Sequence, residues 1–175
     1  MTILLIGDSC SGKTSLEREL CNHGYNRIIS YTSRPIRINE SQDIDYHFVT
    51  ADDFINRLDR GFFAESTIYN SWRYGIAQKD CIDDAIAVVE PVGSRELKKN
   101  PNLHIISFYI EVEERERVIR MMKRGDSVME SFRRIISDQG SFNGIHREVD
   151  YIIQNPHGKL NEAVEQILEI LGGRN

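Results

Sequence analysis

The stretch that decides the fold is "TILLIGDSCSGKT", residues 2–14. Residues 2–6 form an apolar run of the kind expected for a buried strand. Gly7 and Gly12 remove side chains where the chain must turn tightly, and residues 13–21 read as a helix. The first amides of a helix have no partner within it and carry partial positive charge. We therefore predict that this strand–turn–helix unit binds an anion.

Four residues of the turn match the pattern G-x-x-x-x-G-K-[S/T], and the match lies between a predicted strand and a predicted helix, as a phosphate-binding loop requires. Lys13 is expected to reach the outer phosphates of a nucleoside triphosphate, and the Thr14 hydroxyl to sit on Mg²⁺. Cys10 is expected to act through its backbone alone. The alternative is a Gly-rich turn with an exposed lysine. The residues predicted to bind the nucleotide here are Gly7, Asp8, Ser9, Cys10, Ser11, Gly12, Lys13, Thr14 and Ser15.

The composition excludes several classes of protein. The chain has 175 residues, which is the size of one compact domain, and a formal net charge of −5, which argues against duplex nucleic acid as the main partner. Its three cysteines give no disulfide framework. No apolar run is long enough to cross a membrane, and the first residues lack the features of a signal peptide. A cytoplasmic protein without a membrane partner is expected.

Predicted strands and helices alternate along the rest of the chain, which favours a parallel sheet covered on both faces. Strands are expected at residues 27–30, 45–49, 85–90, 103–112 and 151–155, with short antiparallel strands within 62–77. Helices are expected at residues 51–61, 94–99, 113–123, 127–140 and 159–173. Residues 31–45 are interpreted as a loop, and residues 138–149 as a surface connection.

A second polar cluster follows the phosphate loop. The segment "SYTSRPIR", residues 30–37, places Arg34 and Arg37 around a proline, with several hydroxyl groups nearby. Guanidinium groups and hydroxyls in a non-helical loop suit a dianionic phosphate. A solvated polar loop is the alternative.

Six motifs together resemble those of the guanylate kinase family, in family order and at nearly the family spacing: "GDSCSGKT", "TSRPIR", "DYHFV", "GFFAES", "YGIA" and "DYIIQN". The resemblance implies a P-loop three-layer α/β fold with a central parallel sheet, a small strand-rich monophosphate-binding insert and a helical lid. It also implies transfer of the γ-phosphoryl group of ATP to GMP or dGMP with Mg²⁺. The chain would be one domain, divided into a core (residues 1–30, 78–112 and 150–175), an insert (about 31–77) and a lid (about 113–142).

The resemblance also implies roles for residues outside the loop. The acceptor phosphate would be held by Ser30, Arg34, Arg37, Tyr46 and Tyr74. Glu65 would accept two hydrogen bonds from the guanine base, which a carboxylate can do.

A third group of residues would come from the lid. Arg120, Arg124 and Arg134 look like the lid arginines that close on ATP, and with Lys13 and Arg34 they are the predicted catalytic residues. Phosphoryl transfer depends mainly on positioning and charge neutralisation, so cations are the expected machinery. Asn155 matches a family position near the adenine. The remaining cations of the two lid helices are interpreted as a solvated face: Arg115, Arg117, Lys123 and Arg133.

Two departures from the family pattern affect the acceptor. Ile76 stands where a hydroxyl normally meets the guanine carbonyl, and Ile76 cannot donate a hydrogen bond. Of two family acids before Pro91, the first is replaced by Val88, so Glu90 alone remains to serve the acceptor or magnesium-bound water. Two alternatives follow: a same-fold kinase acting on another nucleoside monophosphate or a phosphorylated sugar such as ribose 1,5-bisphosphate, and a non-catalytic binding module. The sequence does not specify an oligomeric state.

Overall fold

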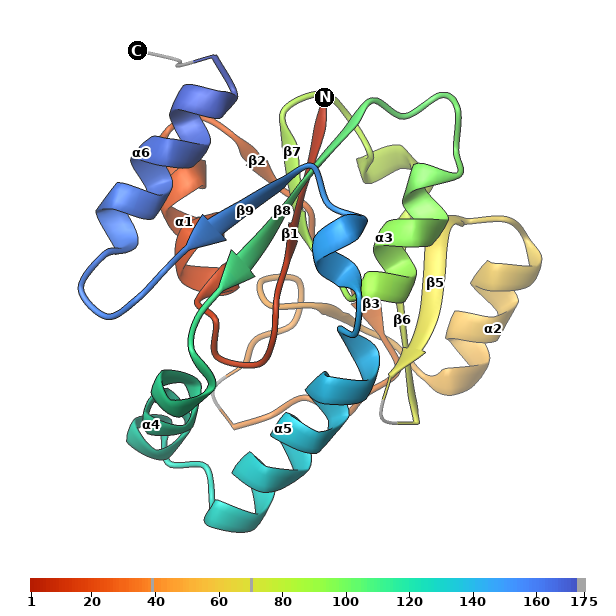
Figure 1. Cartoon of the computed structure of the whole chain (residues 1–175). Helices are drawn as coiled ribbons and strands as arrows, with labels where there is room; N and C mark the ends of the chain where they lie inside the picture. The colour runs from red at the N-terminus through yellow and green to blue at the C-terminus, as the bar shows by residue number, and fades with distance from the viewer. Residues whose placement is uncertain (39, 70, 173–175) are drawn as a thin grey trace.

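The computed structural model describes residues 1–38, 40–69 and 71–172. Its centre is a sheet of five parallel strands in the order β2-β7-β1-β8-β9 (Figure 1). These strands are β1 (Thr2–Ile6), β2 (Asn26–Arg27), β7 (Ala85–Val88), β8 (Ile105–Glu111) and β9 (Tyr151–Gln154). The predicted strand at 27–30 is therefore shorter and begins one residue earlier.

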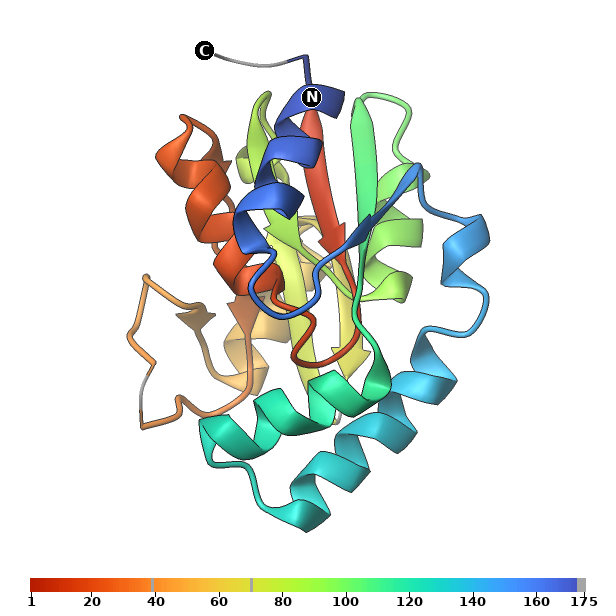
Figure 2. The ribbon, with the colours of Figure 1, turned by 60° about the vertical axis from the view of Figure 1, so that its left-hand side comes forward.

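Helices cover both faces of this sheet, which makes three layers (Figure 2). Helices α1 (Lys13–Asn22) and α6 (Leu160–Ile170) lie on one face, and α3 (Pro91–Lys98) lies on the other. Successive residues of β1 point to opposite faces, so Ile3 and Leu5 pack in one core and Leu4 and Ile6 in the other. An apolar run with no alternation is what such a doubly covered strand needs. The predicted three-layer α/β fold is confirmed.

A second, smaller sheet has the order β4-β3-β6-β5, and all its strands come from one stretch of the chain. They are β3 (Tyr31–Thr32), β4 (His47–Phe48), β5 (Phe63–Tyr69) and β6 (Trp72–Ala77). Helix α2 (Ala51–Asp59) joins β4 to β5, and the Thr50 hydroxyl accepts a hydrogen bond from the amide of Asp53 at its start. The interpretation of 31–45 as loop is wrong at β3, because β6 and β4 supply backbone partners that the sequence does not show.

Two further helices, α4 (Glu114–Arg124) and α5 (Val128–Ser141), lie beyond the carboxyl ends of the central strands (Figures 1 and 2). The sequence predicts a surface connection at residues 138–149. The structure contradicts this for the part that follows α5. Phe142 and Ile145 are buried in the core beneath α3, and a short 3-10 helix spans Ile145–Arg147. The remaining short 3-10 helix is Gln78–Asp80. Among the described residues, no helix has the length and apolar character to cross a membrane.

Candidate active site

The phosphate loop joins β1 to α1, and its two glycines stand where no side chain fits. Gly12 has φ +97°, the left-handed region, and a Cβ there would collide with the amide of Asn155. A Cβ on Gly7 would lie 2.7 Å from the carbonyl oxygen of Ile110. The loop is therefore packed tightly against the ends of two neighbouring strands, β8 and β9.

Lys13 folds back onto this loop. Its Nζ donates to the carbonyl oxygens of Gly7 and of Asp8, the latter at 3.0 Å. Burial lowers the pKa of the Lys13 amine, although Glu90, Asp138 and Asp8 act in the opposite direction. Lys13 is half-buried, which differs from the exposed lysine of the alternative interpretation. The amine is held by weak acceptors that a phosphate would replace.

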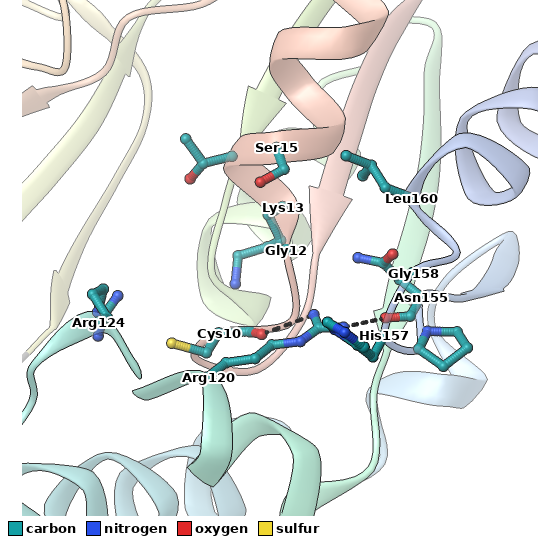
Figure 3. A pocket seen from close by; sticks show the side chains of 12 residues that line it. Cys10, Gly12, Lys13, Ser15, Arg120, Arg124, Asn155, His157, Gly158 and Leu160 are labelled. Atoms are coloured by element: carbon teal, nitrogen blue, oxygen red, sulfur yellow. Dashed lines mark hydrogen bonds between the residues drawn. The ribbon is translucent and has the colours of Figure 1, made fainter. Parts of the chain in front are cut away.

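A cavity of about 490 Å³ opens on one side of the loop. Its walls are loop residues 10 and 12–15, the side chains of Arg120 and Arg124, and residues 155–158 after β9. Figure 3 shows Arg120 lying across this cavity, where it donates to the carbonyl oxygens of Cys10 (3.3 Å) and Asn155 (2.7 Å). The Asn155 side chain is buried and donates to the Ser11 carbonyl oxygen at 2.8 Å. Asn155 thus ties the loop to the end of β9 as well as lining the cavity.

A second cavity, of about 250 Å³, opens on the other side of the same loop. It lies between the loop, the small sheet and α5. Every residue predicted to bind the acceptor lines it except Ile76, and these are Ser30, Arg34, Arg37, Tyr46, Glu65, Tyr74 and Glu90. The two cavities share Cys10, Lys13, Thr14 and Arg124, so they meet at the loop.

Arg34 is the buried cation of the second cavity. It is 7 % exposed and donates from Nη2 to Glu40 Oε1 at 2.8 Å. Its guanidinium also lies 5.5 Å from the ring centre of Tyr46. Burial alone would raise the pKa of Glu40, but hydrogen bonds from Arg34 and from the Arg37 amide hold that pKa below its usual value. Glu40 therefore stays ionised and orients Arg34, a role that the sequence reasoning missed.

Two carboxylates of this cavity carry an oxygen with no partner among the described residues: Oε2 of Glu65 and Oε2 of Glu90. Burial raises the pKa of Glu65 to about 7 and that of Glu90 to about 6, although Lys13 partly counteracts the shift of Glu90. Gly93 lets α3 approach closely, because a Cβ there would lie 2.9 Å from Glu65 Oε2. Unpaired buried acceptors are costly, so both oxygens suit a ligand that donates hydrogen bonds.

Two of the predicted lid arginines lie at the edge of the second cavity. Arg124 donates from Nε to Asp126 Oδ1 at 3.1 Å, and Arg134 lies 3.4 Å from Asp126 Oδ2. Asp126 thus brings these two cations together at the junction of α4 and α5. The third, Arg120, faces the first cavity instead.

Ile76 does not reach either cavity. It is fully buried and packs with Leu4, Ile28 and Val89, although its register partner in the sheet is Glu65. In this structure Ile76 therefore does not line the cavity of the predicted acceptor site. Thr67, which the sequence reasoning did not consider, lines the cavity instead. Thr67 lies two residues after Glu65 in β5, so the two side chains share one face of the strand.

Arg117 was expected on a solvated helix face, and this expectation is wrong. It is 5 % exposed and pairs with Asp138, another buried residue that the sequence reasoning did not identify. Neither has a local signal in the sequence, because the partner lies on a different helix.

Known proteins resemble this chain over nearly its whole length. A family model described as guanylate kinase matches residues 1–173. The guanylate kinase of Syntrophus aciditrophicus is 34 % identical over 174 residues, covering 94 % of this chain and 82 % of the relative. That of Thermotoga maritima is 25 % identical over 177 residues, covering 96 % and 84 %.

Solved structures show the same fold. The crystal structure of guanylate kinase from Anaplasma phagocytophilum has a TM-score of 0.74 at 19 % identity, covering 98 % of this chain and 84 % of that one. A shikimate kinase from Bacteroides thetaiotaomicron has a TM-score of 0.57 at 13 % identity, covering 98 % of both chains. The second likeness concerns the fold alone. With a family model that spans nearly every residue and a relative above 30 % identity, the chain belongs to the guanylate kinase family.

Proposed function

We propose that this protein is an ATP-dependent kinase that transfers the γ-phosphoryl group of ATP to GMP or dGMP. The observation that carries the proposal is the meeting of two cavities at one phosphate loop, with Lys13, Thr14 and Arg124 in both walls. Donor and acceptor bound on either side would bring their reacting phosphates to the same place. Such positioning is a large part of catalysis of phosphoryl transfer.

The donor side uses the loop and α4. Amides at the start of α1 point partial positive charge at the phosphates. Lys13 would exchange its loop carbonyls for phosphate oxygens, a stronger charge-assisted bond. Arg120 and Asn155 would line the adenosine end.

The acceptor side uses the small sheet. Arg34 and Arg37, with the hydroxyls of Tyr46 and Tyr74, would hold the monophosphate. The unpartnered oxygen of Glu65 would accept from the guanine base. Guanine presents two adjacent donors on this edge, whereas adenine presents an acceptor there, so the carboxylate would discriminate between them.

The residues present fit magnesium. Among the described residues, no group of three acidic, histidine or cysteine side chains could cage a metal. Mg²⁺ with a nucleotide does not need one, because phosphates and water supply most of its ligands. Thr14 would hold the ion directly and the unpartnered oxygen of Glu90 would hold it through water. When bound, the ion neutralises phosphate charge.

The lid contributes charge and the exclusion of water. Arg124 and Arg134 lie at the rim of the acceptor cavity, where they can stabilise the charge on the transferring phosphoryl group. Closure over both nucleotides would keep water from accepting that group.

The proposal is tested by a coupled ADP-release assay over a panel of acceptors: GMP, dGMP, AMP, CMP and ribose 1,5-bisphosphate. Turnover with GMP or dGMP well above the others is the expected result. A preference for the phosphosugar would support the alternative that the replacement of the first acid by Val88, which lines the acceptor cavity, suggests. A chain that binds no ATP would instead be a binding module, against which the intact phosphate loop argues.

A further inference from the structure

A buried ionic cluster joins the two lid helices to the phosphate loop through Arg117 and Asp138, two residues that the sequence did not assign to the site. Arg117 on α4 donates from Nη1 to Asp138 Oδ2 on α5 at 2.9 Å. Arg117 is 5 % exposed and Asp138 is 1 % exposed. The pair therefore lies inside the protein, at the place where both helices meet the loop.

Asp138 also binds the loop directly, with both of its oxygens. Oδ2 accepts from the backbone amide of Ser9 at 2.9 Å, and Oδ1 accepts from the Ser9 hydroxyl at 3.0 Å. Ser9 itself lines the acceptor cavity. One carboxylate thus fixes the backbone and the side chain of a loop residue at once.

The residue before Ser9 is held from the other side. Oδ1 of Asp8 lies 3.6 Å from Arg117 Nη1, and Oδ2 of Asp8 accepts from the hydroxyl of Tyr109 on β8. The consecutive loop residues Asp8 and Ser9 are therefore in contact with side chains from α4, α5 and β8. Arg117 is the cation common to both carboxylates.

Stability does not account for this arrangement well. Replacing a buried ion pair by apolar side chains is often neutral or stabilising, so such a pair is weak evidence for a structural role. Arg117 Nε has no hydrogen-bond partner among the described residues, so the cluster is not fully satisfied. What the cluster does supply is a fixed geometry for the loop backbone.

We propose that Asp138, through Ser9 and Arg117, is a positioning residue that holds the phosphate loop in the shape that binds the triphosphate of ATP. This inference rests on the proposed donor site. It also makes the base of the lid, where α4 begins and α5 ends, a fixed pivot on the loop rather than a moving part.

The sign of the effect separates this role from simple electrostatics. Asp138 is an anion near a site for phosphate, and removing its charge would by itself strengthen the binding of ATP. Removing its second acceptor oxygen frees the loop and would weaken that binding. Because Arg117 already compensates the charge of Asp138, the loss of positioning should be the larger effect.

The test compares Asp138→Asn with Glu114→Gln by isothermal titration with ATP, alongside urea unfolding of each protein. Glu114 is the matched control, because it bonds to Gln139 and so also joins α4 to α5, but on the exposed side. We expect Asp138→Asn to weaken ATP binding by about tenfold, the usual scale for a lost charge-assisted hydrogen bond. We expect no change for Glu114→Gln.

Two outcomes overturn the inference. Unchanged or tighter ATP binding by folded Asp138→Asn would show that the carboxylate does not position the loop. A lower free energy of unfolding with unchanged ATP binding would show that Asp138 has a structural role alone. If Asp138→Asn does not fold, Ser9→Ala removes only the hydroxyl contact and must still weaken ATP binding about threefold. A wild-type protein that binds no ATP would instead refute the proposed function. The measurement needs no acceptor, so a kinase for another acceptor leaves the inference intact.

Discussion

Glu65 shows how a single residue can carry opposing effects on folding and on recognition. Glu65 is 7 % exposed, and one of its carboxyl oxygens has no hydrogen-bond partner in the part of the chain that the structure describes. Burial raises its pKa in the folded protein to about 7, above the ordinary value of 4.5. The neutral form is therefore favoured by folding, while the ionised form is the one that can accept two hydrogen bonds from a base.

The first prediction concerns the pH dependence that follows. The stability associated with neutral Glu65 is fully present below pH 4.5 and is lost as the pH rises to about 7. Glu65→Gln should therefore raise the free energy of unfolding by about 2 kcal/mol near pH 8 and leave it unchanged near pH 4. Urea unfolding at the two pH values measures this. An equal change in the free energy of unfolding at both pH values would mean that ionisation of Glu65 destabilises the folded protein little.

The second prediction concerns Lys13. Among the described residues, its amine donates hydrogen bonds only to loop carbonyls, so Lys13→Ala removes no hydrogen bond to the core. Turnover of ATP should fall by about a thousandfold, because a cation aimed at the transferring phosphate is lost. The midpoint of thermal unfolding should stay within a few degrees. Substantial remaining activity would contradict the role of the loop.

The third prediction concerns Ile76. On sequence alone, Ile76→Ser should increase the preference for guanine, whereas the buried position leads to a different expectation. Serine there would leave a void and an unpaired hydroxyl among Leu4, Ile28 and Val89, at a cost of about 3 kcal/mol. Urea unfolding measures that cost. A stable variant with a changed acceptor profile would show that position 76 reaches the ligand after all.

At the scale of elements, the phosphate loop depends on the ends of its neighbouring strands. Gly12 lies against Asn155 after β9, and Gly7 lies against the backbone of β8. The loop is therefore shaped by tertiary packing as well as by its own sequence. The small sheet has the same dependence, because the pairing of β5 with β6 sets Tyr74 opposite Thr67, and both residues line the acceptor cavity.

The fourth prediction tests the packing of this loop. Gly12→Ala places a Cβ against the Asn155 amide, at a φ of +97° that alanine tolerates poorly. We expect ATP affinity to fall by more than about tenfold, while binding of the acceptor, on the other side of the loop, changes little. Fluorescence titration with each ligand separately gives both values. Gly61→Ala is the control, because Gly61 also has a positive φ but has nothing within 4 Å of its Cβ position.

At the scale of the whole molecule, the two adjacent cavities are the proposed binding sites of two ligands. Each should stabilise the folded state in proportion to its own affinity, by about 2.7 kcal/mol at a hundredfold excess over Kd. The fifth prediction is that ATP and GMP each raise the unfolding temperature, and that Lys13→Ala removes the response to ATP but keeps the response to GMP. Differential scanning fluorimetry measures this. Loss of both responses would mean that the variant is misfolded or that the two sites are not separate.

The amino-acid sequence by itself determined the succession of the main strands and helices along the chain, the phosphate loop and the family. These depend on local patterns: an apolar run, two glycines at fixed spacing, and arginines around a proline. The division into core, insert and lid, and the roles of the site residues, stay predictions.

Only the tertiary structure decided which side chains face the cavities and which are buried. It placed Ile76 in the core, brought Glu40 to Arg34, and joined Arg117 to Asp138 and the loop. In each case the partner lies on another element, or the exposure depends on what packs above it. Local patterns carry no record of such long-range contacts, because a charged residue on a helix has the same local sequence whether water or a buried carboxylate lies opposite it.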